Sequence, residues 1–404
     1  MKPFLVLGLL TVLGVSAQTN IKFDFSGGPA PAGWIAVAPT NVYSAAAGFG
    51  FEPGATLVPA GSATPALTSS NPFAFSVKVP EGNYRVTAIL ATDAVATIKA
   101  EQRRLMVEHV RPVAGQPVTF IVNVRTPRIS DGAKVSLKQR ELETETVNWD
   151  EKLTLEFNGV HPGLIQLTIA PAAVPTVYLT GDSTVCDQPA EPWNSWGQML
   201  PRFFKPDVAV ANYAESGESI KSSLGAHRFD KVFSRLKTGD YLFVQFGHND
   251  QKDKSTNALA TYRANLEKIV ARTRELGGTP VLVTSMERKS GLQQDTLAGY
   301  PGTVRAVAQA EHCALIDLHA MSRIFYRALG PKLELAFQDG THHNNYGSYE
   351  LAKCIIVGIQ QAGLPLAEFI SADFTGFDPA RPDDAATFIM PASPMVSSEK
   401  PLGN

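Results

Sequence analysis

VYLTGDST, residues 177–184, is the stretch of sequence that decides the fold of the second half of this chain. Its apolar start is typical of a buried strand, and Gly-Asp-Ser follows where that strand would end. A side chain in this place lies at the carboxyl edge of a sheet, which is where open α/β sheets bind their ligands. The stretch therefore predicts an α/β domain that carries the hydroxyl group of Ser183 at the edge of its sheet.

Apolar runs and amphipathic stretches alternate after this strand. Four more runs lie at residues 208–212, 241–246, 279–284 and 314–317. The clearest helix is expected at residues 258–276, where one face collects Leu259, Tyr262, Leu266, Ile269 and Val270. A last helix is expected around residues 348–363. Alternation of this kind predicts a parallel sheet with helices on both faces.

The first half of the chain has a different rhythm, because apolar residues alternate with polar or small ones. This period of two, seen at residues 73–79, 118–124 and 153–157, is typical of half-buried strands. Many short strands separated by turns, without a convincing helix, favour a β-sandwich. We therefore expect an all-β sandwich domain over residues 18–172, a second domain over residues 176–372 and a C-terminal tail over residues 373–404. The tail is rich in Pro, Ala and Ser and should wrap the surface or be mobile.

Residues 1–17 have the pattern of a secretory signal peptide. Lys2 precedes a short apolar run, and small residues follow at 15–17. The run is shorter than the roughly 20 residues of a membrane span. The alternative is a buried N-terminal strand or anchor. We expect an exported protein, secreted or periplasmic, that does not sit in a membrane.

The composition narrows the classes of partner. The chain has 404 residues, of which 44% are hydrophobic and 18% charged, as in a soluble globular protein. Its formal net charge of −2 argues against nucleic acid and anionic membranes as partners, because it offers no broad basic field. A polyanion such as pectin would have to be met by local Arg or Lys side chains.

Three cysteines do not make a disulfide framework in a chain of this size. Cys313 and Cys354 are a possible pair that spacing does not decide. Cys186 lies three residues after Ser183 and is interpreted as a small buried residue rather than a nucleophile, because no base is placed for it.

Asp339 and His342 provide the groups that a nucleophilic serine needs. Their spacing of three residues, on a turn, can bring a carboxylate and an imidazole together. His342 then accepts the serine proton and Asp339 orients the ring. The alternative is a turn before an N-capped helix, with an exposed histidine. His343 is a competing base, but its direction differs by about a third of a helical turn.

Two further segments offer hydrogen-bond donors. Gly217 has no Cβ, so its backbone N–H can approach a ligand oxygen closely; the alternative is a glycine that turns the chain before a helix that starts near Ser219. Asn249 carries two amide donors directly after the third apolar run. His248 and Asp250 raise the alternative of a metal site, but no His or carboxylate cluster with ligand spacing accompanies them.

Four blocks of sequence now stand in order along the chain. They read LTGDST at 179–184, NxAxxGxS at 212–219, QFGHND at 245–250 and DGTHxNxxG at 339–347. Together they resemble the SGNH (GDSL) hydrolases and, within them, the rhamnogalacturonan acetylesterases. The resemblance implies a three-layer α/β/α domain with a central parallel five-stranded sheet. It also implies catalytic roles for Ser183, His342 and Asp339, and an oxyanion hole made by the backbone N–H groups of Ser183 and Gly217 and the side chain of Asn249.

The first half carries no such motif and is similar only in architecture to galactose-binding-like sandwiches. Trp34 and Trp149 are expected to be buried, although either could form a sugar platform. Trp196 should begin a helix and pack inward. Trp193 lies on the loop before it and is a candidate substrate-binding residue, as is His248.

The resemblance implies a secreted carbohydrate esterase that removes O-acetyl groups from acetylated rhamnogalacturonan, a plant cell-wall pectin, without a cofactor. Acetylxylan and acetylated homogalacturonan are the alternative polymers. Glu215 and Glu218 flank Gly217 and place negative charge where a polyuronate would pass. An alternative of another class is a carbohydrate-binding protein whose hydrolase domain is inactive.

Overall fold

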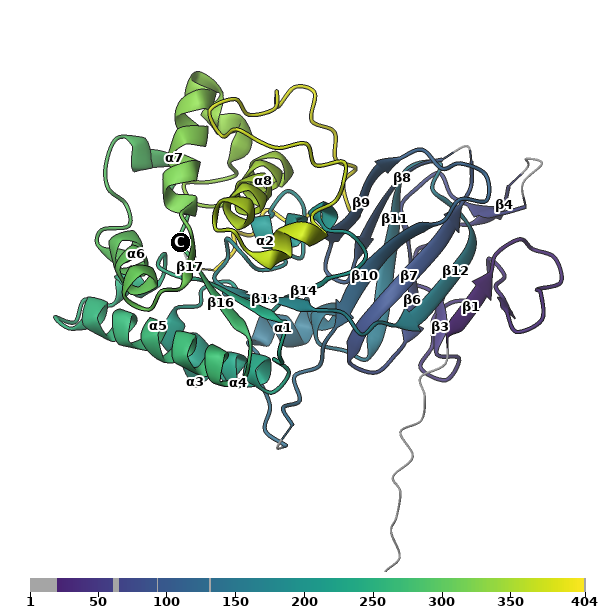
Figure 1. Ribbon diagram of the computed structural model, residues 1–404. Helices are drawn as coiled ribbons and strands as arrows, with labels where there is room; N and C mark the ends of the chain where they lie inside the picture. Colours follow the sequence, from purple (N-terminus) through teal and green to yellow (C-terminus); the bar gives the residue numbers. More distant parts are fainter. Residues whose placement is uncertain (1–19, 61–64, 93, 131, 403–404) are drawn as a thin grey trace, which may run out of the picture.

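The computed structural model describes residues 20–60, 65–92, 94–130 and 132–402, so the expected signal peptide lies outside it. Figure 1 shows two parts side by side: the strands β1 to β12 form one, and a second sheet surrounded by helices forms the other. The chain passes from the first part to the second between Pro171 and Thr176.

Two mainly antiparallel sheets build the first part, as the period-two segments predict. Among the described residues, one sheet has the order β10-β7-β12-β1-β2 with β4 and β5 at its side, and the other has the order β3-β6-β11-β8-β9. Apolar side chains of both sheets, such as Phe23 and Phe75, belong to one buried cluster. The bounds of these strands are Ile21–Asp24 (β1), Ile35–Ala36 (β2), Phe49–Phe51 (β3), Val58–Pro59 (β4), Leu67–Thr68 (β5), Phe73–Lys78 (β6), Gly82–Leu90 (β7), Val95–Ala100 (β8), Arg104–Val110 (β9), Val118–Val124 (β10), Lys152–Val160 (β11) and Gly163–Pro171 (β12).

One expectation for this part is wrong, because it contains helical turns. Helix α1 (Gln139–Glu143) and the 3-10 turn η1 (Thr146–Asn148) follow β10. The buried side chain of Glu141 stabilises them, since it accepts hydrogen bonds from the backbone of Lys138 and the indole of Trp149. A five-residue helix fixed by tertiary contacts leaves too short a pattern to be seen in sequence.

The second part is the predicted parallel sheet. All five apolar runs become strands, in the order β14-β13-β15-β16-β17, and every neighbouring pair is parallel. The bounds are Thr176–Gly181 (β13), Ala209–Asn212 (β14), Tyr241–Gln245 (β15), Thr279–Val283 (β16) and Ala314–Ile316 (β17). The predicted α/β domain with a central parallel five-stranded sheet is confirmed.

Helices cover both faces of this sheet, which gives three layers (Figure 1). Side chains of α2, α7 and α8 pack on one face, and side chains of α3 to α6 pack on the other. The bounds are Trp196–Met199 (α2), Ile220–Gly225 (α3), Arg228–Phe233 (α4), Ala258–Glu275 (α5), Tyr300–Ala310 (α6), Leu318–Leu329 (α7) and Asn345–Gln361 (α8). Helix α5 buries Tyr262, Leu266, Ile269 and Val270 as predicted, but Leu259, in its first turn, is 40% exposed.

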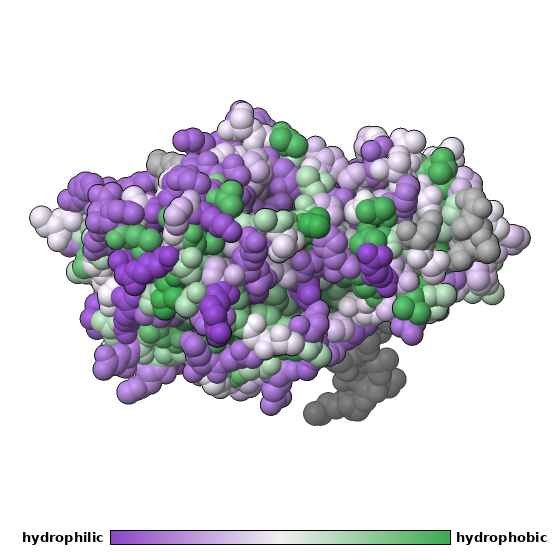
Figure 2. All heavy atoms as spheres, turned by 90° about the horizontal axis from the view of Figure 1, so that it is seen from above, coloured by the Kyte–Doolittle hydropathy of each residue, from purple (hydrophilic) through white to green (hydrophobic). Residues whose placement is uncertain are grey.

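The segment after α8 crosses back to the first part of the molecule (Figure 1). Asn158 of β11 donates to the carbonyl of Ala392 at 2.8 Å, and Lys99 of β8 donates to the carbonyl of Pro391, also at 2.8 Å. The described part of the tail therefore wraps the surface, which is one of the two expectations. Hydrophobic residues are scattered among hydrophilic ones on the face in Figure 2. No helix within the described residues is long and apolar enough to span a membrane.

Candidate active site

Ser183 lies directly after β13, at the carboxyl edge of the parallel sheet. Gly181 allows the strand to end there, because a Cβ at this position would come within 2.7 Å of both the Val185 side chain and the Gln245 carbonyl oxygen. Asp182 then holds the turn, accepting hydrogen bonds from the Thr184 backbone N–H at 3.0 Å and the Thr184 hydroxyl at 2.7 Å. A strand followed by a tight, hydrogen-bonded turn thus fixes the position of the Ser183 hydroxyl.

His342 and Asp339 converge on that hydroxyl. The Nε2 atom of His342 lies 2.8 Å from Ser183 Oγ, and its Nδ1 atom lies 2.9 Å from Asp339 Oδ2. The second oxygen of Asp339 accepts the backbone N–H groups of Thr341 and His342, each at 2.7 Å, so the loop orients the carboxylate. Burial opposes ionisation of Asp339, but the hydrogen bonds from His342 outweigh it and lower the pKa of Asp339. The hydroxyl of Ser183, the imidazole of His342 and the ionised carboxylate of Asp339 therefore form a continuous chain of contacts.

His343 points elsewhere. Its Nε2 atom lies 3.0 Å from the hydroxyl of Tyr326, and its ring packs against Phe337. Burial lowers the pKa of His343 to about 3, and the neighbouring His342 adds to this effect. His343 is a neutral residue of the core.

Gly217 and Asn249, the predicted oxyanion-hole residues, belong to two loops that contact each other. Gly217 has a φ of +79°, a conformation that favours glycine. The Asn249 side chain donates to the carbonyl of Glu218 at 3.0 Å, which places its amide against the Glu218–Ser219 peptide, one peptide beyond Gly217. An amide has two N–H groups, so one donor remains for a ligand. Helix α3 starts after Ser219, whose hydroxyl caps it by accepting from the backbone of Ser222.

His248, a candidate substrate-binding residue, is buried beside this site. Its Nδ1 atom lies 3.2 Å from Asp182 Oδ2, which gives a second carboxylate–imidazole pair next to Ser183. Burial opposes ionisation of Asp182, but His248 outweighs it and lowers the pKa of Asp182. The Nε2 atom of His248 has no hydrogen-bond partner among the described residues.

Trp193 contacts the site edge-on. Its ring lies 5.9 Å from that of His342 at an angle of 89°, and its indole N–H donates to the Ser397 carbonyl at 3.1 Å. It is only 6% exposed, because the tail covers it. Trp196 begins α2 and is buried, as predicted. Trp149 is buried as expected. The prediction that Trp34 is buried is wrong, because its side chain is partly exposed beside Lys22.

Glu215 and Glu218 do not present free charge near Gly217. Both are buried, and each is paired with a cation from the first half of the chain. Arg140 pairs with Glu215, and Lys138 lies 2.7 Å from Glu218. Burial raises the pKa of Glu215 to about 8, with Glu145 adding to this effect and Arg140 opposing it. The negative charge of Glu215 and Glu218, which was expected where a polyuronate would pass, is therefore neutralised by Arg140 and Lys138.

Two carboxylates on the loop after Ser183 are paired in the same way. Asp187 lies 3.2 Å from Arg104, and Glu191 lies 2.6 Å from Arg103. Burial favours the protonated form of Glu191, but Arg103 and Lys99 outweigh it and lower the pKa of Glu191. The charged seam, as we call it, consists of these four contacts: Arg103–Glu191, Arg104–Asp187, Lys138–Glu218 and Arg140–Glu215. Each cation belongs to the first half, so no motif in the second half reveals it.

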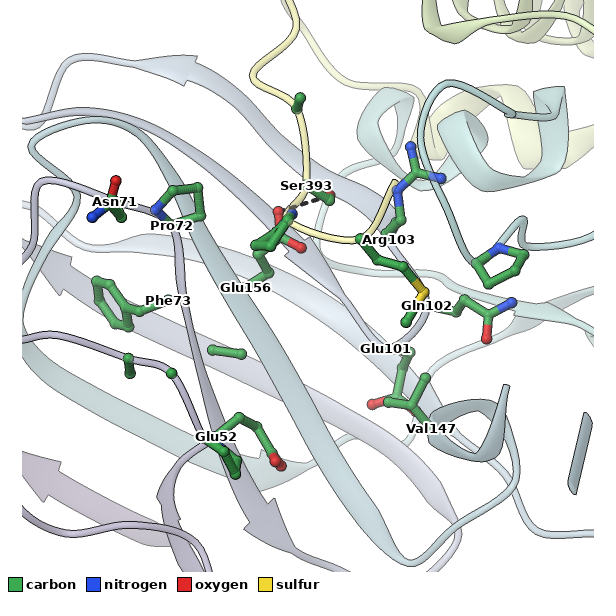
Figure 3. A pocket seen from close by; sticks show the side chains of 18 of the residues that line it. Glu52, Asn71, Pro72, Phe73, Glu101, Gln102, Arg103, Val147, Glu156 and Ser393 are labelled. Atoms are coloured by element: carbon green, nitrogen blue, oxygen red, sulfur yellow. Dashed lines mark hydrogen bonds between the residues drawn. The ribbon is translucent and has the colours of Figure 1, made fainter. Parts of the chain in front are cut away.

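A cavity of about 630 Å³ lies where the two halves and the tail meet. Figure 3 shows the side chains of Glu52, Phe73, Glu156 and Arg103 around it and the hydrogen bond between Ser393 and Glu156. Its lining residues Pro189 and Met395 also line a groove of about 160 Å³ that contains Trp193. The two hollows therefore adjoin.

The cysteines are free thiols, so Cys313 and Cys354 are not paired. Cys186 is buried, and burial raises its pKa well above the ordinary value, as suits an inert thiol. Within the described ranges, no group of three or more His, Cys, Asp or Glu residues is arranged to hold a metal ion.

The GDSL-like lipase/acylhydrolase family matches residues 179–348, the segment that contains all four motif blocks. The rhamnogalacturonan acetylesterase RhgT of Bacillus subtilis (strain 168) is 36% identical over 216 residues, which cover 48% of this chain and 93% of that protein. The chain belongs to the GDSL-like lipase/acylhydrolase family. It is an esterase of that family.

Other relatives of this esterase differ in how much of the chain they match. The probable rhamnogalacturonan acetylesterase YesY of the same bacterium is 31% identical over 209 residues, which cover 48% of this chain and 96% of YesY. The crystal structure of Bacillus subtilis YxiM covers 86% of this chain and 99% of that chain, with 24% identity and a TM-score of 0.48.

Proposed function

We propose that the protein is a carbohydrate acetylesterase that removes O-acetyl groups from rhamnogalacturonan by a Ser-His-Asp mechanism. The observation that carries the mechanism is the unbroken contact chain from Ser183 Oγ to His342 and on to Asp339. The substrate class is supported by relatives named rhamnogalacturonan acetylesterase. Neutralisation of Glu215 and Glu218 by Arg140 and Lys138 removes the feature of the sequence that argued against a polyuronate.

In the proposed mechanism, Ser183 Oγ attacks the acetyl carbonyl carbon while its proton passes to His342 Nε2. The carbonyl oxygen becomes an oxyanion that the Ser183 and Gly217 backbone N–H groups and the Asn249 amide stabilise. The bond to the sugar oxygen breaks, and that oxygen leaves with the proton from His342. Water then attacks the acetyl-enzyme, again giving a proton to His342, and releases acetate. Asp339 keeps the ring in one orientation throughout.

The remaining assignments of the first half belong to this proposal. Its two packed sheets support a galactose-binding-like sandwich, and the cavity shared with the tail adjoins the groove at Trp193. Trp193 and His248 are proposed to contact the sugar that carries the acetyl group. Export to the cell exterior or periplasm, directed by residues 1–17, gives the enzyme access to a cell-wall polymer.

Acetate release tests the proposal. The wild type should release acetate from acetylated rhamnogalacturonan faster than from acetylxylan, and Ser183→Ala should lower the rate on every ester by about 10⁴-fold or more. Thr303→Ala, an exposed hydroxyl on α6, is the matched control and should be as active as the wild type. A preference for acetylxylan would overturn the substrate assignment.

The alternative of an inactive hydrolase domain on a carbohydrate-binding protein is tested by the same variant. Under that alternative, the wild type and Ser183→Ala are equally inert toward a soluble aryl acetate, while both are retained by the polysaccharide. The contact of Ser183 with His342 favours the enzyme.

A further inference from the structure

Arg288 bridges two loops of the active site. It follows β16, on the strand edge where Ser183 and Asn249 also lie. Its Nε atom donates to the Thr341 hydroxyl at 3.2 Å, beside His342, and one Nη atom donates to the His248 carbonyl at 3.2 Å, beside Asn249. The guanidinium group is thus held by the residues that precede His342 and Asn249 in their loops.

Within the described residues, Arg288 donates its side-chain hydrogen bonds to neutral oxygens. Its third hydrogen bond goes to the carbonyl of Thr296 at 3.0 Å, so all three acceptors are neutral oxygens. No carboxylate of the described residues forms an ion pair with it. This sets Arg288 apart from the arginines of the charged seam, each of which pairs with a buried carboxylate.

The carboxylates nearest to Arg288 are engaged elsewhere. Asp339 binds His342, and Asp182 binds His248. Glu287, the preceding residue, binds His319 at 3.1 Å and Arg323 at 3.1 Å. Neutral oxygens therefore hold the Arg288 guanidinium in place, while the nearby carboxylates bind other side chains.

Partial burial makes this arrangement favourable for an incoming anion. Arg288 is half-buried, and this burial lowers its pKa, although Asp182, Glu287 and Asp339 oppose the effect. A guanidinium remains charged in any protein and has five N–H donors, of which three are used here. Carboxylates are the anions that match this planar group, through charge-assisted hydrogen bonds.

We propose that Arg288 binds a carboxylate of the substrate, that of a uronate in the polysaccharide at or next to the acetylated sugar. This inference rests on the proposed function and deepens it, since it explains how a chain of net charge −2 accepts a polyanion. Arg288 is then a specificity-determining residue that acts on binding. Aryl acetates and neutral polymers do not use it.

The test compares Arg288→Gln with the wild type on two substrates. One is a set of acetylated rhamnogalacturonan oligosaccharides with free carboxylates, and the other is the same set with those carboxylates methyl-esterified. For the free acids, Arg288→Gln should raise KM by about 10- to 100-fold with little change in kcat, because a charge-assisted contact is lost. The loss in kcat/KM on the free acids should exceed the loss on the methyl esters and on an aryl acetate by at least about 10-fold, because only the free acids lose the charge-assisted contact.

Two further variants separate binding from structure. Arg288→Lys keeps the charge but not the planar fork, so its KM for the free acids should lie between those of the wild type and Arg288→Gln. Arg263→Gln removes a guanidinium that pairs with Glu267 on α5, and it should match the wild type on all substrates. An equal loss on free acids and methyl esters would overturn the proposal, since a purely structural role has that effect.

Inhibition by galacturonate separates this inference from the proposed function. Galacturonate should inhibit aryl acetate hydrolysis by the wild type, galactose should inhibit much less, and Arg288→Gln should lose the difference. If the wild type does not act on rhamnogalacturonan but this pattern holds, the proposed substrate fails and the carboxylate site stands. If galacturonate and galactose inhibit the wild type equally, the carboxylate site fails whatever the polymer.

Discussion

The two halves of the molecule contribute to the active site in opposite ways. The second half carries every residue of the proposed chemistry on loops at one sheet edge, and these loops also carry buried acids: Asp187, Glu191, Glu215 and Glu218. The first half carries no catalytic motif, but it supplies the cations that pair with those acids: Arg103, Arg104, Lys138 and Arg140. One half performs the reaction, and the other keeps its loops electrically neutral.

This difference gives the first half a structural role at the active site, because its cations compensate buried charge on the loops of the second half. A buried carboxylate without a partner is costly, so the loops on both sides of Ser183 and Gly217 depend on the charged seam. RhgT, by contrast, is matched along 93% of its length by 216 residues, about the extent of one half of this chain. The similarity to RhgT therefore does not extend over both halves of this chain.

Removing Arg103 should have the largest effect on stability. It pairs with Glu191 at 2.6 Å and also donates to the Trp193 carbonyl at 3.0 Å. Arg103→Met leaves a buried carboxylate with less compensation and should lower the free energy of unfolding by about 3–5 kcal/mol. Denaturant unfolding measures this, with Arg272→Met, at an exposed pair with Glu275, as the control. If Arg103→Met lowers the free energy of unfolding no more than Arg272→Met does, the charged seam does not stabilise the loops.

Removing the Asn249 amide probes the chemistry of the second half and leaves the four ion pairs of the seam in place. Asn249→Ala should lower kcat by about 10²–10³-fold, equivalent to about 2.7–4 kcal/mol of transition-state stabilisation, because an oxyanion donor is lost. Its unfolding free energy should change much less than its kcat. Steady-state kinetics on an aryl acetate provide the readout, and Asn257→Ala, an exposed residue before α5, is the matched change. An unchanged kcat would rule Asn249 out of the oxyanion hole.

Asp339 should make the stability of the second half depend on pH. Its pKa is lowered in the folded protein, so its ionised form contributes stability that is fully present above its unfolded pKa of about 3.9 and is lost as pH falls through the folded value. Asp339→Asn should therefore be less stable than the wild type by about 1–2 kcal/mol at pH 6, and the gap should shrink toward pH 3. Thermal or denaturant unfolding at both pH values checks this. A gap that widens in acid would contradict the assignment.

A change at Trp193 should have the smallest effect on stability, because it removes a single hydrogen bond to the tail. Trp193→Phe removes the indole N–H that donates to Ser397, and it should cost about 0.5–1.5 kcal/mol of unfolding free energy. Arg103→Met should lower the free energy of unfolding more than Trp193→Phe does, because it removes the hydrogen bond to the Trp193 carbonyl together with the ion pair to Glu191. If Trp193→Phe were the more damaging change, the tail rather than the first half would be the main support of this loop.

The architecture of the second half was predictable because its signals are local. Five apolar runs became the five parallel strands, and the one clear misassignment on α5, Leu259, lies in the helix's first turn. Asp339 and His342 are also a local pair, three residues apart on a turn that closes through backbone hydrogen bonds. By contrast, Trp34 was expected to be buried and is not, and α1 was missed because a tertiary contact of Glu141 stabilises it.

By itself, the sequence determined the parallel sheet, the position of Ser183 at its edge and the residues that could form a triad, since strand periodicity and turn chemistry act over a few neighbours. Contacts between distant residues decide that Glu215 and Glu218 are neutralised, that Trp193 lies under the tail, and that Arg288 forms no ion pair within the described residues. These outcomes depend on which charges meet across residues as far apart as Lys138 and Glu218, or Arg288 and Thr341. Ion pairing and burial are set by distance in space, and no local pattern in the chain encodes that distance.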